Sequence, residues 1–419
     1  MGAVPTAQKA SAEKIAQEAL DKFADKGGSK GIQVKYVPFV NTADNIAAIL
    51  GGTGTDVVYD YNYAQYIEDK LFVPMETYIK DAGISDSIWS AGQLNVYKEG
   101  GHLYAVPAYM GTVCYAVNTS LLDSLGQAYP TSDWTSDTFV SFCQTFTGTT
   151  TSGAKRYGGM LYQWDNEIDG SRWIFNAFNG ALMNADGTKS TLSAPGSLAA
   201  GEWMFQQLYW PGICTTRNIN YAAAFGAGTL VMRTMGTWEI LPAVTDYQDS
   251  FQWIFLPFPI FSAGRTTFST DDFYAVNVES KHIDEAAEVA LWASSSTYWN
   301  TFNMQLQLIS PARVDLWDDW ISVVKQAAPP LANQDLSWYA DAAQKGYALA
   351  PLYYRYNDPE CEAAVNAVIS SLYTQSSTDV ATAFASADAQ VDAILEAGAS
   401  AAASSTASSG SSSTSSSVK

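Results

Sequence analysis

The first 61 residues alternate between the spacing of helices and the spacing of strands. Two stretches, residues 11–26 and 41–50, carry apolar side chains at helical intervals, and Thr42 or Asp44 is the predicted N-cap of the second. Two others, residues 31–40 and 56–61, alternate apolar and polar side chains as strands do. A helix–strand–helix–strand order predicts an α/β fold with a largely parallel sheet.

Length and composition limit what such a fold can do. The chain has 419 residues, too many for one ordinary hydrophobic core, so more than one lobe is expected. Its formal net charge of -20 repels phosphate backbones and argues against nucleic acid as a partner. The 13 Trp and 24 Tyr residues exceed what a core needs, and each such ring has an apolar face and a polar edge. The sequence contains no run of about 18 apolar residues, so no membrane span is predicted.

The rest of the chain continues the mixed pattern. Further strands are predicted at residues 103–109, 113–118 and 273–278, and helices at 282–295 and through most of 344–395. After Gly398 nearly all residues are Ala, Ser, Thr or Gly, the composition of a flexible linker. The four cysteines show no CxxC spacing, which leaves open two disulfides or four buried thiols.

Five stretches occur in the order typical of one protein family. The first contains GTGTDVVYDY, the second LYAVPAYMGTVCYAVN, the third FGAGTLVMRTMGTWEI, the fourth FYAVNVESKHIDEAAEV and the fifth APLYYRYNDPECEAA. Together they make residues 10 to 397 resemble the extracellular solute-binding proteins of family 1. These are the maltose-binding-protein-like, sugar-capturing components of bacterial ABC importers.

The resemblance implies a two-lobed, type II periplasmic-binding-protein-like α/β fold with a ligand cleft between the lobes. It implies an extracellular monomer that takes an oligosaccharide, closes by a hinge and delivers the ligand to permease subunits without cofactor, metal or catalysis. It also implies a lipid anchor at the cell surface in the native form, although the signal and the lipidated Cys are absent from this chain. The expected crossing segments lie near residues 109–114, 268–273 and 308–313. The expected lobes are residues 1–110 with 273–309 and residues 111–272 with 310–397, followed by a flexible tail or linker at 398–419.

The ends of the chain depart from the family. Members open with a strand ahead of the first helix, and only MGAVP stands in its place here. A Ser-rich spacer, which family members carry near the amino end, stands at the carboxyl end as SSTASSGSSSTSSSVK. Either the termini are rearranged, for example by circular permutation, or the amino end is trimmed and the tail is an ordinary disordered one.

Catalytic and metal motifs are weak in this sequence. GGSKG matches a nucleophile elbow in letters, but it follows a helix and precedes a strand, which reverses the required order. DNEIDG, from residue 165, opens like a calcium loop, but Asn176 stands where the bidentate Glu is needed. GTGTD lacks the Lys-Ser/Thr of a phosphate loop and indicates instead a turn into a strand. A glycoside hydrolase with paired carboxylates among the aromatics remains the alternative function.

Sugars require flat apolar rings for their faces and polar groups for their hydroxyls. The residues just past DVVY, from Asp60 to Tyr63, lie where the family forms a wall of its cleft. Alternatively, Tyr59 and Tyr63 are core residues and Asp60 is a helix cap. Trp238 in GTWE matches the family's stacking platform. Asp271 or Asp272 lies at the second crossing, and one of Tyr353, Tyr354 and Tyr356 is expected to face the ligand. The acidic loop beside Trp164 is either a sugar contact or a plain surface loop. The predicted ligand-binding set is Asp60, Tyr61, Tyr63, Tyr109, Trp164, Asp165, Glu167, Trp173, Trp238, Asp272 and Tyr354.

Overall fold

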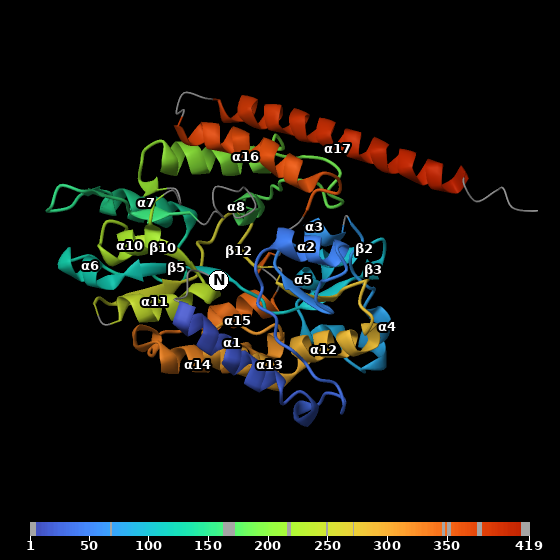
Figure 1. Cartoon of the computed structure of the whole chain (residues 1–419). Coiled ribbons are helices and arrows are strands. Elements are labelled where there is room, and N and C mark those ends of the chain that lie inside the picture. Colours follow the sequence, from blue (N-terminus) through green and yellow to red (C-terminus); the bar gives the residue numbers. More distant parts are fainter. Residues whose placement is uncertain are drawn as a thin grey trace, which may run out of the picture. The chain divides into compact units, whose positions relative to one another are not determined.

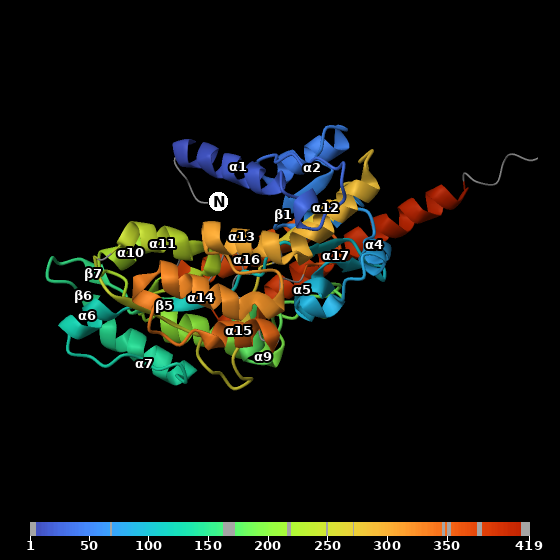
Figure 2. The same ribbon diagram turned by 90° about the horizontal axis from the view of Figure 1, so that it is seen from below.

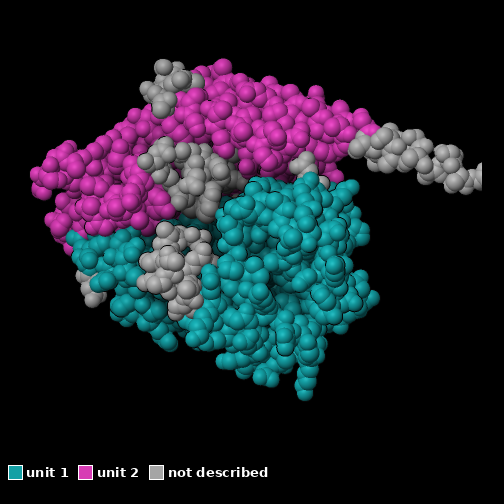
Figure 3. Space-filling view, viewed as in Figure 1, with its two compact units in different colours: residues 1–120, 235–257, 267–351 teal, residues 121–234, 258–266, 352–419 magenta. Residues whose placement is uncertain are grey.

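The computed structural model describes most of the chain as a mixture of helices and short strands (Figure 1). The described ranges are residues 6–67, 69–161, 172–215, 219–248, 250–270, 272–345, 348–349, 353–374 and 379–411. The chain divides into two compact units (Figure 3). Unit 1 comprises residues 1–120, 235–257 and 267–351, and unit 2 comprises residues 121–234, 258–266 and 352–419. The lobe boundaries predicted above stay a prediction. The terminal residues on which the rearrangement hypothesis depends lie outside the described ranges.

Unit 1 contains most of the strands. Its elements are α1 (Thr6–Leu20), η1 (Ala24–Lys26), α2 (Thr42–Leu50), β1 (Val57–Asp60), α3 (Tyr63–Ile67), α4 (Glu76–Asp81), η2 (Asp86–Ile88), α5 (Ala91–Val96), β2 (Lys98–Glu99), β3 (His102–Leu103), β4 (Ala105–Pro107), β5 (Val113–Asn118), η5 (Thr237–Glu239), α11 (Ile240–Tyr247), β11 (Trp253–Leu256), β12 (Thr267–Phe268), β13 (Phe273–Val276), α12 (Ile283–Ser295), α13 (Thr297–Gln307), η6 (Val314–Leu316), α14 (Trp317–Ala327), η7 (Pro329–Leu331), α15 (Ser337–Gln344) and β14 (Ala348–Leu349).

Unit 2 is mainly helical. Its elements are α7 (Ser136–Phe146), β6 (Gly148–Thr149), β7 (Lys155–Arg156), β8 (Gly159–Met160), α8 (Arg172–Ala177), α9 (Pro195–Glu202), the π-helix η4 (Trp203–Tyr209), β9 (Cys214–Thr215), α10 (Tyr221–Gly226), α16 (Asp358–Thr374) and α17 (Val380–Ser411). Two further elements, α6 (Thr119–Ser124) and β10 (Met232–Gly236), span the points where the chain passes from one unit to the other.

The sheet that organises unit 1 has the order β1-β13-β4. Strand β13 runs antiparallel to both neighbours, with Asp60 opposite Phe273 and Phe273 opposite Pro107. The prediction of a largely parallel sheet is therefore wrong for these three strands. Strands β1 and β4 do run the same way, but β13, from much later in the chain, inserts between them. Helix α12 covers this sheet and packs on all three strands (Figure 2).

Residues 31–40, predicted as a strand, contain no strand residue in the structure. The segment is instead held by one side chain of α1: Gln17 Nε2 donates to the Val34 carbonyl at 2.8 Å, and Gln17 Oε1 accepts from the Tyr36 amide at 2.7 Å. Alternating side chains permit a strand, but a strand also needs a neighbouring backbone to bond. The N-cap of the next helix, α2, is Asn41 rather than Thr42 or Asp44. The Asn41 side-chain oxygen Oδ1 accepts a hydrogen bond from the Asp44 amide at 2.8 Å.

Helices α16 and α17 pack side by side in unit 2 (Figure 1). Asp388 on α17 accepts from the Ser190 hydroxyl at 2.6 Å and from the Leu192 amide at 2.8 Å, which attaches the helix to the loop before α9. The linker predicted from residue 398 is helical as far as Ser411 in the structure, since its alanines favour a helix and no proline interrupts it. Among the described residues, no helix is both long enough and apolar enough to cross a membrane.

Candidate ligand-binding site

The register of the unit 1 sheet brings three predicted residues to one edge. Asp60 ends β1, Pro107 ends β4 and Phe273 begins β13, and these three lie opposite one another. Tyr61, Tyr109 and Asp272 each follow or precede one of those strand ends, so they gather at the same edge. The Ala108 amide donates to the Asp272 carbonyl at 2.8 Å and fixes this alignment. We call the cluster of Tyr59, Tyr61, Tyr109, Trp238, Thr270 and Asp272 the aromatic edge.

Asp272 is the buried carboxylate of the aromatic edge, with 1% of its surface exposed. Its Oδ1 accepts a hydrogen bond from the Tyr59 phenol at 2.9 Å, whereas its Oδ2 is buried without a hydrogen-bond partner. Burial raises the pKa of Asp272 to about 6, although hydrogen bonds from Thr270, Tyr109 and Tyr59 oppose the rise. At neutral pH the group is therefore mainly an ionised hydrogen-bond acceptor.

The tyrosines beside Asp272 remain protonated donors at physiological pH. Burial is the main cause that raises the pKa of Tyr59 well above its ordinary value, and the Asp272 charge adds to it. The pKa of Tyr61 is also raised, first by burial and then by Asp60 and Asp272. Tyr61 is 36% exposed, and its ring meets the edge of Phe39 at a centroid distance of 5.6 Å. A supported ring with an exposed portion can stack on an apolar ligand face.

Asp60 is fully buried, and protein groups occupy its acceptor positions. Its Oδ1 accepts from the Thr42 hydroxyl at 2.9 Å and from the Tyr61 amide at 2.7 Å. Its Oδ2 accepts from Asn45 Nδ2 at 3.4 Å and from the Tyr66 phenol. A carboxylate has about four lone-pair positions, so this one is saturated by the protein. Asp60 therefore ties α2 and α3 to the end of β1.

Tyr63 belongs to the core next to this edge. It is 2% exposed, its phenol donates to the Tyr97 carbonyl at 2.8 Å, and its ring packs against Phe273 at 5.5 Å between centroids. This is the core role that the sequence left open as the alternative for the segment.

Trp238 is half-buried in η5, and its indole lies against Gly111. A Cβ at Gly111 would stand 2.7 Å from Trp238 Cζ3 and 2.8 Å from the Thr270 hydroxyl, so only glycine fits between them. The Gly111 amide also donates to that hydroxyl at 2.9 Å. Glycine at this position thus allows the indole to approach Thr270, two residues before Asp272.

Three supporting residues were missed by the sequence analysis. Gln93 Nε2 donates to the Tyr109 carbonyl at 2.8 Å and to the Thr270 carbonyl at 3.1 Å, and the Tyr97 phenol donates to the Asp272 carbonyl at 3.1 Å. Nothing in the sequence around Gln93 or Tyr97 indicates this role. Tyr59 was considered only as a core residue, although it lies next to the predicted Asp60 on the same strand.

The remaining predicted residues belong to unit 2. Trp173 on α8 is 1% exposed and packs on Phe258 with ring centroids 4.1 Å apart. Tyr354 is 4% exposed, and its amide donates to Asp358 Oδ1 at 2.5 Å at the start of α16. Both belong to unit 2. Trp164, Asp165 and Glu167 lie outside the described residues. Within the described ranges, no group of three or more His, Cys, Asp or Glu side chains is placed to hold a metal ion.

Comparison with solved structures shows the fold. An ABC substrate-binding protein from Listeria monocytogenes, in complex with cycloalternan, aligns with a TM-score of 0.72 at 17% identity, covering 91% of this chain and 96% of that one. A sugar transporter from Rhizobium etli aligns with a TM-score of 0.73 at 18% identity, covering 91% of this chain and 96% of that one. UgpB from Mycobacterium tuberculosis, in complex with glycerophosphocholine, aligns with a TM-score of 0.72 at 18% identity. This alignment covers 94% of this chain and 99% of that one. The fold is the two-lobed, type II periplasmic-binding-protein fold.

Sequence comparison shows the family. No curated protein matches the chain. The family model described as bacterial extracellular solute-binding protein matches residues 18–313, which is more than half of the chain. The chain therefore belongs to the bacterial extracellular solute-binding proteins.

Proposed function

We propose that this protein binds a neutral oligosaccharide at the aromatic edge of unit 1 and delivers it to the permease subunits of an ABC importer. The observation that carries the proposal is the buried Asp272 carboxylate with one unbonded oxygen, set beside exposed Tyr61 and half-buried Trp238. A pyranose offers C–H-rich faces to such rings and hydroxyls to such an oxygen.

Within the predicted set, four residues suit direct contact. Tyr61 and Trp238 supply rings, Tyr109 supplies a half-buried ring just after β4, and Asp272 accepts from hydroxyls. Asp60 and Tyr63 act as supports, because their polar atoms already bond protein groups. A contribution of unit 2 to ligand binding remains a prediction. It concerns Trp173, Tyr354 and the three residues of the acidic loop.

The charge of the site favours a neutral ligand. Cycloalternan, bound by the Listeria protein, is one neutral saccharide, whereas the glycerophosphocholine bound by the Mycobacterium protein is a zwitterion with a phosphate and a quaternary ammonium. An anion near Asp272 would meet its carboxylate at neutral pH, and the net charge of -20 adds to the repulsion.

The protein releases its ligand intact in this proposed function. Glycoside hydrolysis requires two carboxyl groups that reach the scissile bond from opposite sides. At the aromatic edge Asp272 has an unbonded oxygen, but the neighbouring Asp60 is saturated by protein donors.

The native protein is further proposed to be an extracellular monomer held at the cell surface by a lipid anchor.

A thermal-shift screen followed by ligand recovery tests the proposal. The panel contains maltose, maltopentaose, cellopentaose, xylopentaose and glycerophosphocholine. A ligand that binds the native state raises the melting temperature by mass action, and at least one neutral saccharide is expected to do so. The bound saccharide should then be recovered at its original length. A shift with glycerophosphocholine alone would refute the sugar assignment, and recovered shorter products would support the hydrolase instead.

A further inference from the structure

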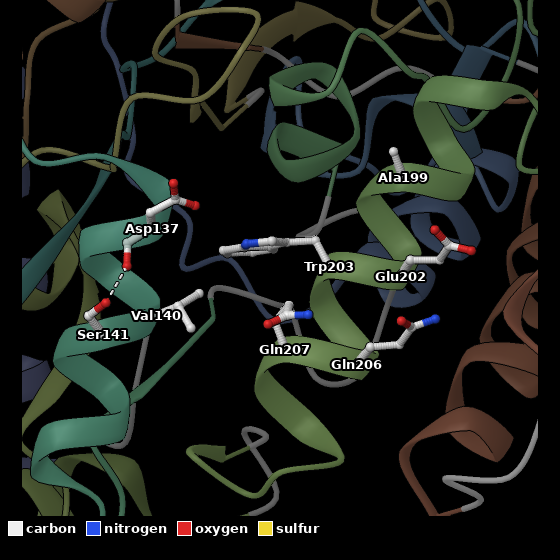
Figure 4. A pocket seen from close by; sticks show the side chains of 8 residues that line it. All are labelled: Asp137, Val140, Ser141, Ala199, Glu202, Trp203, Gln206 and Gln207. Atoms are coloured by element: carbon white, nitrogen blue, oxygen red, sulfur yellow. Dashed lines mark hydrogen bonds between the residues drawn. The ribbon is translucent and has the colours of Figure 1, made fainter.

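Unit 2 contains a groove of its own, between α7 and the segment where α9 passes into η4. The groove has a cavity volume of about 490 Å³ and is lined by a tryptophan and a set of polar side chains (Figure 4). Its lining includes Asp137, Glu202, Trp203, Gln206 and Gln207. All of them belong to unit 2, whereas the residues of the aromatic edge all belong to unit 1.

Trp203 forms a fixed platform at this groove. Its ring contacts Phe261 at 5.1 Å, Phe178 at 5.8 Å and Phe139 at 5.9 Å between centroids, yet the residue is only half-buried. Figure 4 shows the indole extending from its helix toward α7. Trp203 begins a π-helix, a rare element that occurs frequently at functional sites. The ring is thus held from behind by aromatics while part of it stays accessible.

The polar side chains around Trp203 are available to a ligand. Asp137, Glu202, Gln206 and Gln207 are exposed, and within the described residues none of their side chains bonds another protein group. The carboxamides can both donate and accept, and the carboxylates accept only. This combination suits hydroxyl groups, each of which donates and accepts. The two carboxylates disfavour a negatively charged occupant.

We propose that the Trp203 groove is a second saccharide-binding site, for a neutral glycan whose sugar face stacks on Trp203. Hydroxyls at the rim of that sugar bond Gln206 and Gln207 and the carboxylates of Asp137 and Glu202. A second site in unit 2 lets the protein hold glycan independently of the ligand at the aromatic edge. The inference stands on the groove alone and does not depend on the proposed function of unit 1.

Indole NMR signals of the full-length protein test the proposal directly. The probes are maltopentaose, cellopentaose, xylopentaose and the pentamer of N-acetylglucosamine, with the galacturonate pentamer as an anionic control. At least one neutral probe is expected to shift the Trp203 indole signal, which Trp203→Phe identifies. Absence of any such shift with all four neutral probes would overturn the proposal. An equal shift with the galacturonate pentamer would overturn the assignment of a neutral ligand.

Variants separate this groove from the unit 1 site. Trp203→Ala removes the stacking ring, and Gln206→Ala with Gln207→Ala removes two partners of the sugar hydroxyls. In calorimetry with a probe that shifts the Trp203 signal, each variant should lose at least about tenfold in groove affinity. Trp210→Phe is the matched control, because Trp210 follows the same π-helix but donates its Nε1 hydrogen to the Leu372 carbonyl at 2.9 Å. Trp238→Ala should leave the Trp203 shift unchanged. Unchanged affinity in both groove variants would refute the site, whatever happens at the aromatic edge.

Discussion

The phenol of Tyr59 donates a hydrogen bond to Oδ1 of Asp272 at 2.9 Å, across a sequence separation of 213 residues. The bond joins a residue of β1 to the residue that precedes β13, and it holds the buried carboxylate at the edge where both strands end. Because the raised pKa of Tyr59 keeps its proton in place, the direction of this bond is fixed. The other oxygen of Asp272 is buried without a hydrogen-bond partner.

The buried Asp272 predicts a specific pH dependence of stability. Its native pKa is about 6, against 3.8 for the ordinary group, because burial disfavours the ionised form. Between these values the native state binds more protons than the unfolded state. The contribution of this group is therefore fully present below about pH 4 and lost as pH rises through about 6. The difference amounts to roughly 3 kcal/mol, an order-of-magnitude figure.

Urea unfolding of the unliganded protein checks this dependence. Going from about pH 8 to about pH 4, the wild type should gain up to roughly 3 kcal/mol of unfolding free energy relative to Asp272→Asn, which cannot titrate. Effects of the other carboxylates are common to both proteins and cancel in the comparison. If the two proteins show the same pH dependence, Asp272 does not titrate near pH 6.

Truncation of Trp238 should weaken ligand binding strongly. For a ligand found by the thermal screen, Trp238→Ala is expected to lose roughly 2 to 4 kcal/mol of binding free energy, the range of a central aromatic anchor. Trp238→Phe keeps a smaller ring and should lose less. Calorimetry measures both, and the melting temperature without ligand shows whether each variant is folded. Unchanged affinity in a folded Ala variant would remove Trp238 from the site.

Sequence reasoning located the aromatic edge where the signal is local. Tyr61 and Tyr109 end predicted strands and Asp272 precedes one, and a strand end can be identified from its own neighbours. Which strand pairs with which cannot, because pairing depends on contacts distant in sequence. That is why β13 was not placed between β1 and β4, and why Tyr59 was not matched to Asp272.

Partners distant in sequence also set the roles of two further features. Residues 31–40 alternate like a strand, but the side chain of Gln17 rather than a neighbouring strand bonds the Val34 carbonyl and the Tyr36 amide. Asp60 has the residue type and the position of a ligand contact, but donors on α2 and α3 saturate its carboxylate. In both cases the partner, which is not visible in the local pattern, determines the role.

The contact between Gly111 and Trp238 predicts that one methyl group will disturb the site. In Gly111→Ala the new Cβ would lie 2.7 Å from Trp238 Cζ3 and 2.8 Å from the Thr270 hydroxyl, so the indole or the backbone around residue 111 must shift. Affinity for the ligand should fall by about tenfold or more, as measured by calorimetry.

Gly148→Ala is the matched control for this prediction. Gly148 lies in β6 of unit 2, and a Cβ there would meet no atom within 4 Å. Its affinity should equal that of the wild type. Equal affinity in Gly111→Ala as well would show that the position of Trp238 against Gly111 has no bearing on binding.

The four cysteines should be inaccessible thiols in the native protein. Cys114, Cys143, Cys214 and Cys361 are all buried, and Cys143 and Cys214 lie with their Sγ atoms 3.7 Å apart, too far for a disulfide bond. Burial raises the pKa of Cys143 well above its ordinary value, so the reactive thiolate is scarce. Ellman's reagent should therefore label almost no thiol in the native state and all four after unfolding in urea without reductant. If only two react after unfolding, and reductant restores the other two, the neighbouring pair Cys143 and Cys214 is the one to test for a disulfide, through Cys143→Ser.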